Sequence, residues 1–167
     1  MNRNLIIAAV LVLILIGVGA FLFFNQRGGG GAAAATATGT MCANQPAAAT
    51  GLTDAGVTSL RIEDTKEGSG PQAITSNTVR VNYIGRLVNG TEFDASCKEG
   101  RQPFEFTLGG GQVIQGWDSG IVGMRVGGQR RLIIPANLGY GATGSPPTIP
   151  ANAALVFDVE LLEIKQP

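Results

Sequence analysis

Residues 104–122 read FEFTLGGGQVIQGWDSGIV, and this stretch joins a strand pattern to a helix pattern. Its first part alternates apolar with polar side chains, as in a strand with one buried face, at Phe104, Phe106 and Leu108. After three glycines the apolar residues recur three or four positions apart, as on one side of a helix, at Ile114, Trp117, Ile121 and Val122. Gly123 ends that pattern. The stretch therefore predicts a strand, a tight turn and one short helix.

Strand patterns dominate the rest of the chain from residue 52 onward. Val79, Val81 and Tyr83 alternate with polar residues, and Asn89-Gly90 is a dipeptide typical of a two-residue hairpin turn. Residues 131–134 and 155–164 give two further strand-like runs. A sheet and a short helix each need an apolar partner. We therefore expect an α+β fold in which a mostly antiparallel sheet closes over the helix.

The N-terminal part of the chain carries an uncharged apolar segment, residues 5–24, with the sequence LIIAAVLVLILIGVGAFLFF. As a helix it would rise about 30 Å, enough to cross a bilayer. A cleaved signal peptide is the alternative, but its apolar core is shorter, roughly 7 to 15 residues. We predict a membrane anchor over residues 1–27 with a single transmembrane helix. Arg3 and the α-amino group precede it, which favours a cytoplasmic N-terminus and an extracytoplasmic C-terminal domain, periplasmic or at the cell surface in a bacterium.

A segment rich in glycine and alanine follows the apolar stretch. Residues 28–51 have no charge and no aromatic side chain, so they predict a flexible linker that ends where a folded domain, residues 52–167, begins. Cys42 lies in this linker and Cys97 in the domain. In an oxidising compartment a bridge between them is permitted, but two independent thiols or intermolecular bonds are equally consistent with the sequence.

Charge and composition exclude several classes of function. The 12 Lys and Arg balance 12 Asp and Glu without a basic cluster, which argues against nucleic-acid binding. The chain has no histidine, which removes Ser-His-Asp or Cys-His nucleophiles and His-ligated metals. Gly109 to Gly111 lack a following Gly-Lys-Ser/Thr, so they indicate a tight turn rather than a phosphate loop. We expect neither a metal nor a cofactor.

Aromatic side chains occur in nearly every element expected in the domain. Each of them alone fits an ordinary core, but together around one helix they can line an apolar pocket whose two Tyr and one Trp supply polar groups. These residues are Tyr83, Phe93, Phe104, Phe106, Trp117, Tyr140 and Phe157.

Three motifs carry a resemblance to a known family. They are VNYIGRLVNGTEFDAS, PFEFTLGGGQVIQGWDSGI and GQRRLIIPANLGYGATGSPPTIPANAALVFDVELL. Together they closely resemble the FKBP-type peptidyl-prolyl cis-trans isomerases, over residues 57–164. The resemblance implies a strongly twisted antiparallel half-barrel wrapped around one short α-helix. It also implies a rotamase that accelerates X-Pro isomerisation, here during folding of exported proteins, in an apolar pocket without covalent chemistry.

The same resemblance assigns site residues and partners. It implies catalytic roles for Tyr83, Asp94, Ile114 and Tyr140. It implies substrate binding by the apolar residues Phe93, Phe104, Phe106, Val113, Trp117, Ile149 and Phe157. The implied partners are proline-containing polypeptides and macrolides of the tacrolimus and rapamycin type. We expect a monomer, because only Gly17 to Ala20 in the apolar segment resembles a helix-pairing motif.

This sequence departs from the common family pattern in three places, one of which is a short loop from Tyr140 to Ile149 that lacks the chaperone domain inserted in some bacterial relatives. Ser145 stands where the family often has histidine, and the stretch between Asp94 and Pro103 is one residue longer, so Arg101 only approximately matches the usual basic residue. One alternative function is a non-catalytic module that docks a proline-containing segment of one partner, and another is a surface adhesion or assembly factor in which the domain serves only as a scaffold. Because the pocket aromatics and Asp94 are all present, the sequence favours turnover over docking.

Overall fold

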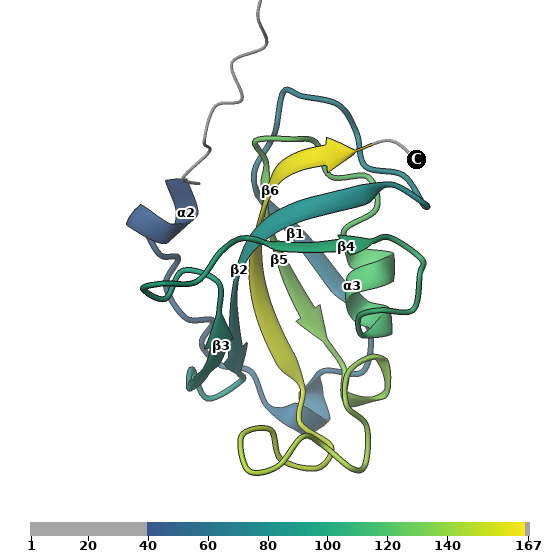
Figure 1. Ribbon diagram of the computed structural model, residues 1–167. Helices are drawn as coiled ribbons and strands as arrows, with labels where there is room; N and C mark the ends of the chain where they lie inside the picture. Colours follow the sequence, from purple (N-terminus) through teal and green to yellow (C-terminus); the bar gives the residue numbers. More distant parts are fainter. Residues whose placement is uncertain (1–39, 166–167) are drawn as a thin grey trace, which may run out of the picture. The chain divides into compact units, whose positions relative to one another are not determined.

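The structure is a computed structural model that describes residues 40–165, so the predicted membrane helix at residues 5–24 lies outside the described residues. Among residues 40–165, no helix is long and apolar enough to cross a membrane. In this part of the chain the strands form one six-stranded antiparallel sheet (Figure 1). They are β1 (Arg61–Lys66), β2 (Thr78–Leu87), β3 (Glu92–Ala95), β4 (Phe104–Thr107), β5 (Gln129–Ile134) and β6 (Leu155–Lys165).

The helical elements of the described chain are short. α2 (Thr40–Ala43) and α3 (Gln115–Gly120) are α-helices, and η2 (Asp54–Gly56) and η3 (Ala136–Leu138) are single 3-10 turns. α3 lies beside the sheet in Figure 1, at the place where the sequence predicts the helix. The expected arrangement of an antiparallel sheet around one helix is therefore confirmed for the folded domain.

The two longest strands form the centre of the sheet. The strand order is β1-β5-β6-β2-β3. β4 pairs with the N-terminal part of β2, from Thr78 to Val81. β2 pairs with β6 from Thr78 opposite Lys165 to Leu87 opposite Leu155, and the register shifts between Arg80 and Val81. Such an irregularity bends a strand and increases its twist. One end of β2 can therefore pair with β4 while the other end pairs with β3.

The inner face of the bent sheet packs on α3. Side chains of β2, β5 and β6 on this face, such as Val81, Leu132 and Val159, are fully buried in one core with Trp117 and Ile121. Glycines let the helix approach closely: a Cβ on Gly116 would lie 2.5 Å from Cγ2 of Ile134, and one on Gly120 would lie 2.7 Å from Leu132. This close contact places Trp117 against the sheet.

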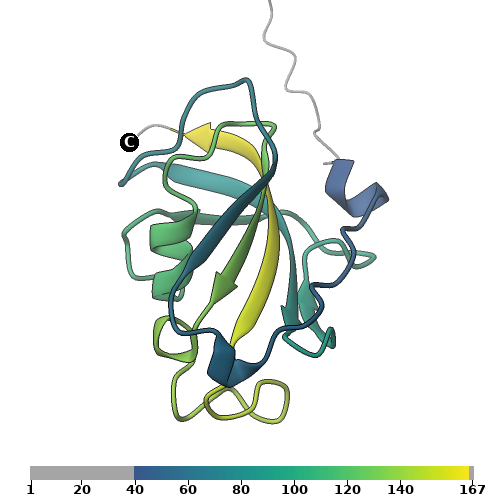
Figure 2. The ribbon, with the colours of Figure 1, turned by 180° about the vertical axis from the view of Figure 1, so that it is seen from behind.

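The outer face of the sheet is covered by residues 40–52, which we call the N-terminal strap. Figure 2 shows the chain running from α2 along the sheet to η2 before β1 begins. Met41 is fully buried against Ile84 and Ala95, and Leu52 packs against a second cluster that contains Val156. Both ends of the strap therefore pack on the domain. Its residues 40–51 belong to the segment that the sequence predicts as a flexible linker.

The outer face of the sheet carries buried polar side chains that need hydrogen-bond partners. Asn82, Asp158 and Glu160 occupy outward positions of β2 and β6, yet they are only 4%, 2% and 3% exposed. Polar residues that alternate with apolar ones along a strand usually face water, but these three side chains are covered. The carboxylate of Glu160 accepts hydrogen bonds from the N–H groups of Thr40 and Met41 at 3.0 and 3.1 Å. The backbone of the strap thus satisfies a buried carboxylate that water would otherwise solvate.

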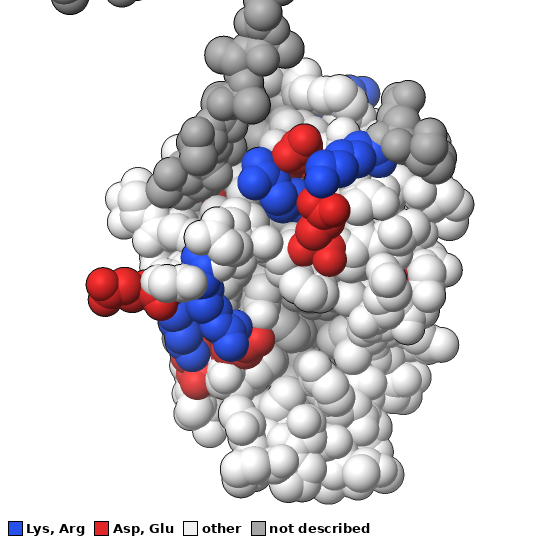
Figure 3. Space-filling view, viewed as in Figure 1, with Lys and Arg blue, Asp and Glu red and all other residues white. Residues whose placement is uncertain are grey.

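Charged side chains form pairs on the surface that Figure 3 shows. Their atoms gather in two clusters, one over β3 and one near the ends of β2, β4 and β6, with a broad uncharged area below. Ion pairs in the second region join Arg80 to Glu163 and Lys165 to Glu105, at 3.0 and 2.7 Å. Because opposite charges alternate across neighbouring strands there, this region has no large field of one sign.

Candidate functional site

An aromatic pocket opens between α3 and the inner face of the sheet. Its cavity volume is about 270 Å³. The lining comes from four strands, the start of the helix and the segment after η3, and it comprises Tyr83, Phe93, Asp94, Phe104, Gln112, Val113, Ile114, Trp117, Tyr140 and Phe157. Apolar and aromatic walls with a few polar groups are the usual composition of a small-ligand site.

Trp117 forms the floor of the pocket. Its side chain is 4% exposed, and its ring lies 5.2 Å from that of Tyr83 and 5.1 Å from that of Phe157, both edge to face. Phe104 approaches the same indole at 6.2 Å, also edge to face. Edge-to-face contacts of this kind fix ring orientations. The floor is therefore rigid, while Phe104 and Tyr140, each 40% exposed, stand at the rim.

One carboxylate is held from both sides at the rim. The hydroxyl of Tyr83 donates to Oδ2 of Asp94 at 2.5 Å, and Nη1 of Arg101 donates to Oδ1 at 2.6 Å. Charge-assisted hydrogen bonds such as these are stronger than neutral ones. Both oxygens of Asp94 therefore have fixed partners, and its orientation toward the cavity is set by β2 and by the loop after β3.

Both tyrosines of the chain lie in this pocket and both have raised pKa values. Burial raises the pKa of Tyr83 to about 12, together with its hydrogen bond and its charge repulsion with Asp94, while Arg101 opposes the shift. Burial, followed by the charge of Asp94, also raises the pKa of Tyr140. Each hydroxyl therefore remains a neutral donor throughout the physiological range.

The structure brings nine of the eleven predicted site residues into the pocket lining. The two exceptions are Phe106 and Ile149, which are each 4% exposed but do not line the cavity. Phe106 lies behind the lining, with its ring stacked on Phe104 at 5.5 Å and 5.6 Å from Trp117. Ile149 exchanges backbone hydrogen bonds with Ser145 and so closes the loop that follows Tyr140. Both residues support side chains or loops that border the pocket.

Sequence reasoning missed Gln112 as a lining residue. Its Oε1 accepts a hydrogen bond from the N–H of Thr107 at 2.9 Å, which ties the end of β4 to the start of the helix. An exposed glutamine after three glycines carries no signal that distinguishes it from a turn residue. Gln112 reaches the cavity because the chain folds back on itself between Thr107 and Gln112.

Gly85 is a second missed residue, and it acts by its lack of a side chain. A Cβ there would lie 2.7 Å from Cε1 of Phe157 and 2.8 Å from Cε2 and Cζ of Phe93. Glycine in β2 thus makes room for two rings that meet edge to face at 5.5 Å. A glycine inside a strand pattern does signal a close approach, although the sequence does not say of what.

The pocket combines apolar and aromatic walls with a few polar groups. Its lining contains no Ser, Thr, Cys or His, and among residues 40–165 no group of three side chains could hold a metal ion. It offers the hydroxyl of Tyr140 and the N–H of Ile114, which precedes the first turn of α3 and has no partner within the helix. The fold and the pocket together define an antiparallel-sheet domain whose aromatic cavity has a few polar groups in its lining.

Comparisons with known proteins identify the family. Residues 70–162 match the profile of the FKBP-type peptidyl-prolyl cis-trans isomerases, and the chain belongs to this family. It is 52% identical over 106 residues to an FK506-binding protein of Neisseria meningitidis serogroup A, a match that covers 64% of this chain and 96% of that one. The solved structure of FkpA from Escherichia coli is similar with a TM-score of 0.58 and 45% identity, over 64% of this chain and 48% of that one.

Other relatives are much longer than the matched region. FK506-binding protein 4 of Dictyostelium discoideum is 52% identical over 107 residues, which are 64% of this chain but 29% of that protein. The corresponding share of the Emericella nidulans protein is 21%. The chain thus spans less than a third of these curated relatives, so what is common to them is the FKBP-type domain.

Proposed function

We propose that this protein is a peptidyl-prolyl cis-trans isomerase that accelerates X-Pro isomerisation during the folding of exported proteins. The observation that carries the proposal is the pocket itself, an aromatic cavity floored by Trp117 with Asp94, Tyr83 and Tyr140 at its rim. Membership of the isomerase family supports the same activity.

The reaction suits a pocket without a nucleophile. Rotation about an X-Pro bond breaks no σ bond and must cross a barrier of about 18 to 20 kcal/mol that arises from amide resonance. A dry apolar cavity disfavours the charge-separated planar amide relative to the twisted form. Hydrogen bonds that are strongest in the twisted form lower the barrier further. The absence of histidine from the chain is therefore no obstacle.

Each polar group of the pocket has a distinct role in this proposal. The proline ring rests on Trp117, and the N–H of Ile114 donates to a substrate carbonyl. The hydroxyl of Tyr140 donates a second hydrogen bond, which its raised pKa keeps available. Asp94, held by Tyr83 and Arg101, faces the carbonyl carbon of the rotating bond. The apolar residues around them exclude water and give the site its affinity.

The cellular setting follows from two further features. The apolar segment at residues 5–24 predicts a membrane anchor, and a Cys42–Cys97 disulfide is typical of an oxidising compartment outside the cytoplasm. We therefore place the domain on the extracytoplasmic side of a membrane as a single-span, monomeric protein. Its ligands would be proline-containing polypeptides and macrolides of the tacrolimus type.

Turnover of a proline peptide tests the function. The full-length chain, purified in a mild detergent, should accelerate cis-to-trans relaxation of an Xaa-Pro-Phe peptide, and tacrolimus should block it. Tyr140→Phe should lower kcat/KM about tenfold, the size expected for losing one ordinary hydrogen bond to the transition state. Glu163→Gln, on the exposed face of β6, is the matched control and should leave kcat/KM unchanged. A folded wild type that binds the peptide without accelerating it would favour the docking module instead.

A further inference from the structure

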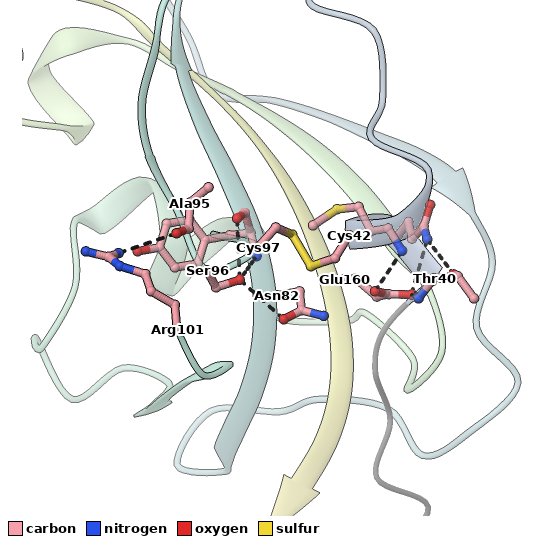
Figure 4. Close-up of a disulfide and its surroundings, with 11 residues drawn as sticks. Thr40, Cys42, Asn82, Ala95, Ser96, Cys97, Arg101 and Glu160 are labelled. Atoms are coloured by element: carbon pink, nitrogen blue, oxygen red, sulfur yellow. Dashed lines mark hydrogen bonds between the residues drawn. A yellow bond between two sulfur atoms is a disulfide. The ribbon is translucent and has the colours of Figure 1, made fainter. Parts of the chain in front are cut away.

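The start of the N-terminal strap is fixed to the domain by a disulfide and three hydrogen bonds at one place. Cys42 forms a disulfide with Cys97, and Glu160 binds the backbone N–H groups of Thr40 and Met41 (Figure 4). The hydroxyl of Thr40 adds a bond of 2.9 Å to the same carboxylate. The backbone that carries Cys42 is therefore held against the sheet by these hydrogen bonds.

The other end of the disulfide lies in the loop between β3 and β4. Cys97 is three residues after Asp94, the carboxylate of the pocket. Between them, Ser96 exchanges hydrogen bonds with the backbone of Tyr83: its N–H donates to the carbonyl at 3.0 Å, and its Oγ accepts from the N–H at 2.9 Å. The bridge thus attaches directly beyond the point where the loop leaves the sheet.

Arg101 returns from this loop to the pocket. Its Nη1 donates to Oδ1 of Asp94 at 2.6 Å and to the carbonyl of Ala95 at 3.4 Å. Its own N–H closes a turn on the carbonyl of Lys98. Residues 98–102 are exposed, and the side chains of the Arg101–Asp94 pair are 51% and 39% exposed. An exposed ion pair contributes only about 0 to 1 kcal/mol, too little to hold a loop in one place by itself.

We propose that the Cys42–Cys97 bridge is a positioning element of the isomerase pocket, which holds the β3–β4 loop so that Arg101 stays on Asp94. The inference rests on the proposed function. In this proposal the strap lies outside the pocket but controls the orientation of the Asp94 carboxylate. When the bridge is absent, the loop moves and Arg101 leaves Oδ1. Asp94 then keeps Tyr83 as its partner but turns away from the reacting amide.

A double-mutant cycle tests whether the bridge acts through Arg101. The variants are Cys42→Ser with Cys97→Ser, Arg101→Ala, and the combination of all three, each in the full-length chain. We expect about a tenfold loss of kcat/KM from either change alone, within the hundredfold that a misplacement of about 1 Å can cost. The combined variant should lose no more than Arg101→Ala, because the bridge has nothing left to position. The proposal would be overturned if the loss in the combined variant equalled the product of the two separate losses. It would also be overturned if the serine variant kept an unchanged kcat/KM.

A stability control separates positioning from general loosening. Val57→Ala removes buried side-chain atoms from the cluster beneath the far end of the strap, away from the loop. It should lower the melting temperature but leave kcat/KM unchanged well below that temperature. Reduction of the wild type with a dithiol, which is oxidised to its cyclic disulfide as the bridge gains two electrons and two protons, should reproduce the serine variant. The serine variant itself should not respond to the reagent.

A second readout does not depend on turnover. In a Tyr140→Phe background, Tyr83 is the sole tyrosine, and the charge of Arg101 lowers its pKa. If the bridge keeps Arg101 in place, the serine variant should form less tyrosinate than the bridged chain at any pH between 10 and 12. Equal tyrosinate fractions would contradict the inference. A wild type without isomerase activity would remove the proposed function, and this titration would still decide whether the bridge positions Arg101.

Discussion

The hydroxyl of Tyr83 donates to Oδ2 of Asp94 at 2.5 Å across the antiparallel pair β2 and β3. Arg101 binds the other carboxylate oxygen at 2.6 Å. The position and the orientation of the Asp94 carboxylate at the pocket rim are therefore both fixed. A preorganised charge contributes most to catalysis, since it needs no rearrangement when the substrate amide twists. The account of the site depends on this arrangement.

Replacing the carboxylate by its amide tests that dependence. Asp94→Asn keeps the shape of the side chain but removes its charge and the ion pair with Arg101. We expect kcat/KM for an Xaa-Pro-Phe peptide to fall about ten- to a hundredfold, with a small change in peptide affinity. Steady-state kinetics measures kcat/KM, and a binding titration measures the peptide affinity. An undiminished kcat/KM would mean that the charge of Asp94 does not contribute to catalysis.

Ligand binding should be visible in the fluorescence of Trp117. It is the only tryptophan in the chain and forms the pocket floor, so its emission reports on the cavity directly. Tacrolimus or a proline peptide should shift or quench this emission in a saturable way. A chain carrying Phe104→Ala, which removes a rim contact with the indole, should bind more weakly. Saturable binding without a change in emission would place the ligand elsewhere.

The two tyrosines predict how the protein responds to high pH. Because the pKa of Tyr83 is raised from 10.0 to about 12, the folded state keeps a proton that the unfolded chain loses above pH 10. Its contribution to stability is therefore complete below pH 10 and is lost between pH 10 and 12. Tyr83→Phe should flatten the fall in unfolding free energy across this interval. Denaturant unfolding at several pH values measures the slope, and equal slopes in both chains would contradict the raised pKa.

The N-terminal strap should stabilise the domain. A disulfide between residues separated by 55 positions is expected to contribute about 4 kcal/mol through the entropy of the unfolded chain. A fragment that begins at residue 52 loses this bridge and the burial of Met41, and leaves Glu160 without its backbone donors. It should unfold at much lower denaturant concentration than a fragment that begins at residue 40. Coincident unfolding curves would show that the strap contributes nothing.

Gly85 should tolerate no side chain. Gly85→Ala places a Cβ against the rings of Phe157 and Phe93, and overpacking of this kind costs about 1 to 3 kcal/mol. Adding Phe93→Leu in the same chain removes one of the colliding rings. The double variant should therefore lose less stability than the sum of the two single changes, as measured by thermal unfolding. Simple additivity would indicate that the collision with the Phe93 ring does not cause the cost of Gly85→Ala.

Local sequence patterns were sufficient for the inner face of the domain. The alternation at Val79 and Val81 identified the buried face of β2, and the spacing of Trp117 and Ile121 identified that of α3, because a helix or strand buried on one side has a periodic apolar pattern. Val122, which was predicted on the same helix face, lies beyond the end of α3 and is 37% exposed. Nine of the eleven residues suggested by the family resemblance line the pocket. Phe106 and Ile149 are buried apolar residues, as expected, but they do not line the cavity. The sequence alone does not distinguish a residue that lines a pocket from one that packs behind the lining.

The outer face could not be predicted, because its partners are distant in sequence. Glu160 reads as a solvated residue of an alternating strand, and Met41 as an isolated apolar residue among glycine and alanine. Only the tertiary contact between them, 119 residues apart along the chain, explains both. The state of Cys42 and Cys97 was open for the same reason, since bridge formation depends on the spatial distance between residues. Their Cα atoms lie 5.1 Å apart in the folded domain.

Catalysed rotation about a bound X-Pro bond can be observed directly at equilibrium. The most direct measurement is magnetic-resonance exchange spectroscopy of a proline peptide at equilibrium with a small amount of the full-length chain. The account predicts exchange between the cis and trans signals that is far faster than the uncatalysed tens of seconds, abolished by tacrolimus and strongly reduced by Asp94→Asn. Signals that show binding of the peptide but no acceleration of its cis-trans exchange would contradict the account.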